Sequence, residues 1–115
     1  MQYILLIATS EAVEAAMDQN ALGEVIAAYG SYTDAMMEAG ILVSGERLRE
    51  STTATTVSIR DGKTHLLDGP YADTKEQLGG FYIIEVPDLD TAISWAARGP
   101  SAHIGSIEVR PIWPM

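Results

Sequence analysis

Residues 68–80, with the sequence DGPYADTKEQLGG, gather the side chains of this chain that are most able to do chemistry. Asp68 stands directly before a Gly-Pro turn signal, and Lys75 follows among further carboxylates. A carboxylate held by a rigid turn can act as a general acid or base, and a lysine can anchor an anionic ligand. Tyr71 offers a ring for packing and a hydroxyl for a pocket. We therefore treat Asp68 as a candidate catalytic residue, and Tyr71 and Lys75 as candidate ligand-binding residues.

These residues also have a purely structural explanation. An aspartate before Gly-Pro can fix a turn through its side-chain oxygen. Lys75 lies beside Asp73 and Glu76 in the sequence, which is typical of a solvated ion-pair cluster. Both explanations stay open at the level of the sequence.

A second charged set lies in the strand expected at residues 105–112, GSIEVRPI. The period-two alternation of a strand places Glu108 and Arg110 on one side of the sheet, and Ile107 and Val109 on the other. Charged groups beneath a protein interface must be paired or hydrated. Glu108 and Arg110 therefore either pair with each other as interface residues or line a pocket. In a pocket, Arg110 would anchor an anion and Glu108 would orient the ligand.

Several other chemistries find no support in the sequence. The chain has no cysteine and only two histidines, His65 and His103, so we expect neither a metal site nor a cofactor. His65 lies three residues before Asp68 on the same expected strand, which places the two side chains on opposite faces. Gly79-Gly80 precedes a strand rather than a helix, which argues against a phosphate-binding loop.

Length and charge narrow the class of protein. The 115 residues predict a single domain spanning residues 1–115. The formal net charge is −9 and no basic run occurs, which argues against direct binding to nucleic acid or to an anionic membrane. The apolar run at residues 3–8 is too short to span a membrane and has no basic residue before it. We expect a soluble, cytoplasmic protein.

The hydrophobic pattern predicts an α+β fold. We expect a helix at residues 21–39, whose apolar stripe is Leu22, Val25, Ile26, Tyr29, Tyr32, Met36 and Ala39. A second helix is expected to begin near residues 87–90 and to end before Gly99-Pro100, with Leu89, Ala92, Ile93 and Ala96 facing inward. Residues 10–20 predict a short helix or a loop.

Strands are expected at residues 3–8, 41–48, 53–60, 63–67, 80–86 and 105–112, with Asp61-Gly62 as the turn of a β-hairpin. This order of elements is typical of a ferredoxin-like split βαβ sandwich with an added β-hairpin.

Two helices can cover only one face of such a sheet. Residues 3–8 are nevertheless apolar on both sides of the strand, and so are most of residues 81–86. The second face therefore needs a cover, and a second copy of the chain is the simplest one. We expect a homodimer in which two sheets face each other and enclose a chamber.

The motif segment resembles the signature of the DGPF-type proteins, a branch of the YCII-related family, whose usual motif reads DGPFAETKE before a Gly-Gly-aromatic step. In this chain Tyr71 replaces the phenylalanine and Asp73 replaces the glutamate. The resemblance extends over nearly the whole chain. It includes Tyr3-Ile4-Leu5-Leu6-Ile7, Ala39-Gly40, Gly45-Glu46, Leu89-Asp90, Ala92-Ile93, Trp95-Ala96-Ala97, Pro100 and Glu108-Val109-Arg110-Pro111.

The resemblance implies a dimeric α+β barrel built from ferredoxin-like subunits. It also implies a regulatory link, because members of this branch often occur beside, or fused to, extracytoplasmic-function sigma factors. Other YCII-like proteins carry a His–Asp pair, proposed as catalytic, with the histidine soon after the first strand. The matching residues 10–20 contain no histidine, so the resemblance does not carry that pair over to this chain.

Two functions remain open from the sequence. The first is a homodimer that binds a small, anionic molecule on the helix-free sheet face, with or without a chemical reaction. The second is a non-catalytic interaction module that binds a protein partner such as a sigma factor.

Overall fold

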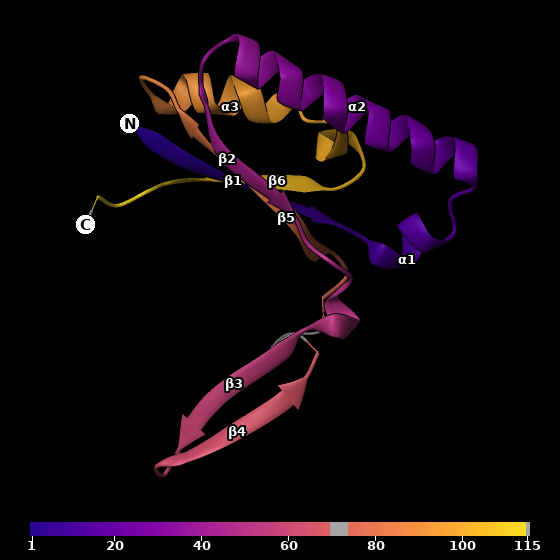
Figure 1. The fold of residues 1–115 in the computed structure, drawn as a ribbon, viewed down its shortest axis with the longest axis vertical. Coiled ribbons are helices and arrows are strands. Elements are labelled where there is room, and N and C mark those ends of the chain that lie inside the picture. The colour runs from indigo at the N-terminus through magenta and orange to yellow at the C-terminus, as the bar shows by residue number, and fades with distance from the viewer. Residues whose placement is uncertain (70–73, 115) are drawn as a thin grey trace.

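An antiparallel four-stranded sheet forms the body of the protein. The computed structural model describes residues 1–69 and 74–114. The sheet consists of β1 (Gln2–Thr9), β2 (Leu42–Arg47), β5 (Gln77–Glu85) and β6 (Ser106–Pro111), in the spatial order β2-β5-β1-β6 (Figure 1). The two strands of each βαβ unit are therefore separated by a strand of the other unit, which is the ferredoxin-like arrangement. The expected α+β fold is confirmed.

Three α-helices connect or flank these strands: α1 (Glu11–Ala15), α2 (Gln19–Glu38) and α3 (Leu89–Ala97). Side-chain caps set where they begin. The carboxylate of Asp18 accepts a hydrogen bond from the Ala21 amide at 2.8 Å, and Asp88 does the same for Thr91. Gly40 follows α2 with φ of 72°, the left-handed conformation that ends many helices.

The core lies between one face of the sheet and helices α2 and α3 (Figure 1). Its buried residues are Tyr3, Leu5, Tyr32, Met36, Ile84, Val86, Ala92 and Ala96. Five residues expected to face inward are instead exposed: Leu22, Ile26, Ala39, Leu89 and Ile93. The apolar stripe of each helix is wider than the strip of helix surface that meets the sheet, so its margin stays in water.

A two-stranded hairpin, here called the arm, projects from the body on the side of the sheet opposite the helices (Figure 1). It consists of β3 (Thr55–Arg60) and β4 (Lys63–Asp68), preceded by a 3₁₀ turn, η1 (Ser51–Thr53). Asp61 and Gly62 both have positive φ, 52° and 73°, as a tight hairpin turn requires. The expected hairpin is confirmed. The radius of gyration is 16.0 Å, compared with about 13 Å for a compact chain of this length.

In the part of the chain that the structure describes, none of the helices combines the length and the apolar character needed to cross a lipid bilayer.

Candidate functional site

The helix-free side of the sheet, here called the open face, presents apolar side chains that are only half-buried. They alternate along β1 and β5 with the core residues that point to the helices. The apolar residues of the open face are Ile4, Leu6, Ala8, Phe81 and Ile83. The sheet thus carries a second hydrophobic surface, as the sequence predicts.

Charged residues edge this apolar centre on both sides. Leu6 pairs in register with Phe81 on one side and with Glu108 on the other, and Phe81 pairs with Glu46. These pairings form a row across the sheet in the order Glu46, Phe81, Leu6 and Glu108. The row has a carboxylate at each end and spans three strand spacings, about 14 Å. In the next row, Ile4 pairs with Arg110.

Glu108 and Arg110 form an ion pair on the open face, between Glu108 Oε2 and Arg110 Nε. Both side chains are more than half exposed, so the pair contributes little to stability. The pairing leaves Glu46 as an acidic residue of this face for which no ion pair occurs within residues 1–69 and 74–114. Sequence reasoning did not single out Glu46, and the register shift between Leu42 and Ser44 in β2 means that simple alternation does not give its side.

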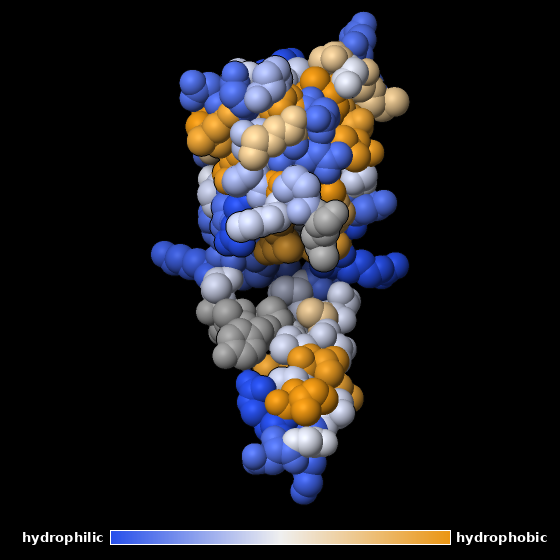
Figure 2. Space-filling view, turned by 90° about the vertical axis from the view of Figure 1, so that its left-hand side faces the viewer, coloured by the Kyte–Doolittle hydropathy of each residue, from blue (hydrophilic) through white to orange (hydrophobic). Residues whose placement is uncertain are grey.

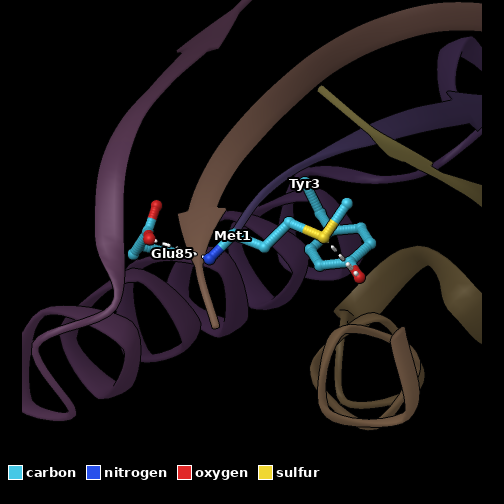
Figure 3. A network of polar contacts seen from close by, with 3 residues as sticks. All are labelled: Met1, Tyr3 and Glu85. Carbon is cyan, nitrogen blue, oxygen red and sulfur yellow. Dashed lines mark hydrogen bonds and ion pairs between the residues drawn. The ribbon is translucent and has the colours of Figure 1, made fainter. Parts of the chain in front are cut away.

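A short polar network lies at the N-terminal end of β1. The Met1 ammonium donates to Glu85 Oε1 at 2.8 Å, and the Tyr3 hydroxyl donates to the Met1 sulfur at 3.4 Å (Figure 3). Glu85 is the last residue of β5 and is exposed. Its carboxylate therefore takes part in a charge-assisted hydrogen bond.

The described residues of the motif segment lie at the end of β4 and at the start of β5. Asp68 is the last residue of β4 and is exposed on the arm, and the unbroken hairpin register places it on the opposite face from His65. Lys75 is exposed, and the next residue, Glu76, accepts a hydrogen bond from Ser106 Oγ at 2.9 Å. This bond ties the end of the segment to the start of β6. Tyr71 lies outside the described residues.

A pocket of about 510 Å³ lies where the arm leaves the sheet, and we call it the arm-root pocket. Its volume is within the range of small-molecule sites. It is lined by Leu48, Arg49, Glu50, Ser51, Thr53, Ala54, Thr74, Gln77 and Leu78. Sequence reasoning missed this pocket. The charged run ERLRE at residues 46–50 is the only sequence signal, and it does not reveal that residues 74–78 lie against it.

A hydrogen-bond network holds the pocket wall in place, and we call it the root network. The Glu11 carboxylate accepts from the Ser51 amide at 2.7 Å and from the Ser51 hydroxyl at 2.9 Å. Gln77 Oε1 accepts from the Glu11 amide at 2.9 Å, and Gln77 Nε2 donates to the Thr74 carbonyl at 2.5 Å. Helix α1, the arm root and the start of β5 are therefore joined.

The tyrosines of α2 belong to the core, on the other side of the sheet. The Tyr32 hydroxyl donates to the Trp95 carbonyl at 2.6 Å, and burial raises the pKa of Tyr32 to about 12. Burial also raises the pKa of Tyr29, whose hydroxyl donates to Ser101. Both phenols are thus neutral at physiological pH and serve packing, as the sequence predicts for the helix stripe. Among residues 1–69 and 74–114, no cluster of three His, Asp or Glu side chains has the arrangement of a metal site.

Comparison with known proteins identifies the family. The whole chain, residues 1–115, matches the YCII-related domain, and the protein belongs to the YCII-related family. An uncharacterised protein of Rhizobium meliloti (strain 1021) is 37% identical over 114 residues, which cover 97% of this chain and 92% of that protein.

A solved structure shares the fold at low sequence identity. It is the 5-chloro-2-hydroxyhydroquinone dehydrochlorinase TftG from Burkholderia phenoliruptrix AC1100, in complex with 2,5-dihydroxybenzoquinone. The TM-score is 0.51 at 15% identity, with 98% of this chain and 94% of that chain covered. The likeness confirms the fold expected from the sequence.

Proposed function

We propose that the protein is a homodimer, paired through the open face, that binds a small anionic molecule between that face and the arm-root pocket. The observation that carries this proposal is the apolar centre of the open face, half-buried within one chain and edged by charges of both signs.

We infer the dimer from the free energy that is lost when the apolar centre of the open face stays in contact with water. Leu6, Phe81 and Ile83 lie side by side on two central strands, and covering the part of each half-buried side chain that is still exposed stabilises by about 0.5–1.5 kcal/mol. A second copy placed face to face would cover them, with two sheets about 10 Å apart. A two-fold axis uses the same patch on both subunits, so no further surface is needed.

An anionic ligand would depend on cations near the open face, because Glu46 and Glu108 edge that face with negative charge. Lys75 and Arg110 would supply positive charge, Glu108 would orient Arg110, and Tyr71 would contribute its ring or hydroxyl to the wall. The arm-root pocket adds Arg49 to this set. If the ligand also reacts, Asp68 is the candidate acid or base, brought to the chamber by the arm.

The fold shared with TftG guides the choice of probe. That protein was solved with 2,5-dihydroxybenzoquinone, a small hydroxylated ring. Hydroxylated quinones, hydroquinones and small aromatic acids are accordingly the first compounds to test against this chain.

A thermal-shift screen tests the ligand proposal, because a ligand that binds only the folded state raises the melting temperature. We expect at least one anionic compound to raise it in the unaltered protein. Lys75→Ala and Arg110→Ala should each reduce this shift. Arg47→Ala is the matched control, because Arg47 is an exposed cation on the helix side of β2. Equal shifts in all four proteins, or none with any anion, would contradict the proposed site.

A further inference from the structure

We propose that the arm is a clasp that closes on a second copy of this chain. This inference rests on the proposed homodimer and adds to it a second, separate contact surface. The arm, rather than the open face alone, then holds the two subunits together.

One face of the arm carries an uncovered apolar cluster, flanked by Thr64 and Asp68. Val57 and Leu66 are directly paired across the hairpin, and Ile59 follows on the same face. Their exposed fractions are 59%, 68% and 58%. A two-stranded hairpin is only marginally stable alone in water, and burial of one face normally supports it. Within one chain, nothing buries the apolar side chains Val57, Ile59 and Leu66 of the arm.

The tip of the arm carries charge that fits an acidic partner. Arg60 and Lys63 are paired directly across the strands, and like charges in that position repel each other. Both cations lie on the face of the hairpin opposite Val57, Leu66 and Ile59, so an acidic group of the second copy, whose formal net charge is −9, would meet them only at the tip, beside the apolar contact.

The direction of the arm makes a second copy the natural occupant. The arm leaves the body on the side of the open face (Figure 1), and apolar residues gather on it (Figure 2). A copy seated on the open face therefore lies beside the arm as well. Under two-fold symmetry each subunit would clasp the other.

The root of the arm is already ordered for this contact. Gly69 N donates to the Ala54 carbonyl at 2.6 Å, Thr56 Oγ1 donates to the Gly69 carbonyl at 3.0 Å, and the root network fixes Ser51. A segment held in its bound direction loses less conformational entropy when it binds.

Sedimentation equilibrium of two neighbouring substitutions tests the clasp. Leu66→Asp places a charge on the apolar face, and Leu67→Asp places the same charge on the opposite face of the same strand, where Leu67 is 52% exposed. We expect Leu66→Asp to raise the dimer dissociation constant by about tenfold or more, and Leu67→Asp by less than about threefold. Circular dichroism checks that both proteins are folded.

The outcomes distinguish the clasp from the dimer itself. If the unaltered protein is a dimer and Leu66→Asp dissociates no more readily than Leu67→Asp, the clasp is wrong and the open-face dimer stands. If the unaltered protein is a monomer at micromolar concentration, both proposals are overturned.

Crosslinking supplies a measurement that does not depend on affinity. The chain has no cysteine, so Ile59→Cys creates a unique attachment point for a photoreactive maleimide. We expect crosslinks between two chains, mapped by mass spectrometry to the body of the partner. Crosslinks only within one chain, or to unrelated protein in preference to a second copy, would overturn the clasp.

Discussion

At residue scale, the Gly79-Gly80 step of the motif segment has an identifiable structural cause. A Cβ atom added at Gly80 would lie 2.8 Å from the carbonyl oxygen of Glu46, on the neighbouring strand. At Gly79 the closest atom would be Thr9 Oγ1 at 3.8 Å, an ordinary van der Waals distance. Only the second glycine is therefore required for the pairing of β2 with β5.

This difference predicts unequal effects of two adjacent substitutions. Gly80→Ala should lower the free energy of unfolding by about 1–3 kcal/mol, because the two strands must move apart. Gly79→Ala should change it by less than about 0.5 kcal/mol. Urea unfolding of both variants measures the difference, and equal effects would show that contact with Glu46 is not the reason for the glycine.

Tyr32 predicts a loss of stability at high pH. Its pKa is 10.0 in the unfolded chain and about 12 in the fold, because burial disfavours the phenolate. The stabilisation is fully present below pH 10 and disappears as the pH rises through about 12, and two pKa units correspond to about 3 kcal/mol.

Urea unfolding between pH 8 and pH 12 measures this loss. Tyr32→Phe should be less stable than the unaltered protein at pH 8, because it lacks the hydrogen bond to the Trp95 carbonyl. It should also lose less stability as the pH rises. Parallel pH curves for the two proteins would assign the alkaline loss to other groups.

The candidate residues could be placed from the sequence only where local alternation decides their position. The two-residue alternation of strands predicted that Glu108 and Arg110 share the helix-free side of the sheet. It also predicted that His65 and Asp68 point to opposite faces of their strand. The structure has both arrangements. Arg49 and Ser51 were missed because the arm-root pocket depends on residues 74–78 meeting residues 48–54. No local pattern encodes that contact.

At element scale, the root network gives helix α1 a definite role. The helix has only five residues and no buried side chain, so packing alone does not hold it in place. The two hydrogen bonds from Ser51 to Glu11 join it to the base of the arm. The direction of the arm therefore depends on a residue that lies 40 positions earlier in the chain.

Removing that carboxylate should loosen the arm root without unfolding the body. We expect Glu11→Ala to speed amide hydrogen exchange at Ser51 and in η1 by about tenfold or more, since hydrogen bonds to a charged acceptor contribute about 1.5–3 kcal/mol. Glu24→Ala, an exposed acid on α2, is the matched control. Unchanged exchange in η1 would mean that the arm root is held by other contacts.

The hairpin and the helices differ in how far their sequences determine them. The turn at Asp61-Gly62 was predictable because both residues must adopt positive φ, which is a local requirement. Leu22 and Ile26 were predicted to be buried but are exposed. Helical periodicity shows which side of a helix is apolar, but it does not show how wide a strip of that side the sheet covers. Tertiary packing sets that width.

At the scale of the whole molecule, the open face should control assembly. Ile83→Asp puts a charge in the centre of the open face and should convert the proposed dimer to a monomer at micromolar concentration. Ile26→Asp is the matched control, because Ile26 is 53% exposed on α2, away from that face. Size-exclusion chromatography with light scattering measures both masses, and a dimeric Ile83→Asp protein would contradict pairing through the open face.

The two-sided character of β1 has a consequence for how substitutions in it would be tolerated. Odd positions such as Leu5 support the fold of each chain, and even positions such as Leu6 support the proposed pairing. The loss of stability caused by a substitution at an odd position should persist at any expression level, since folding is unimolecular. The loss of dimer caused by a substitution at an even position should be reversed by overexpression, because association obeys mass action. A saturation library of this strand, scored at low and high gene dosage, would show a phenotype that alternates from one codon to the next.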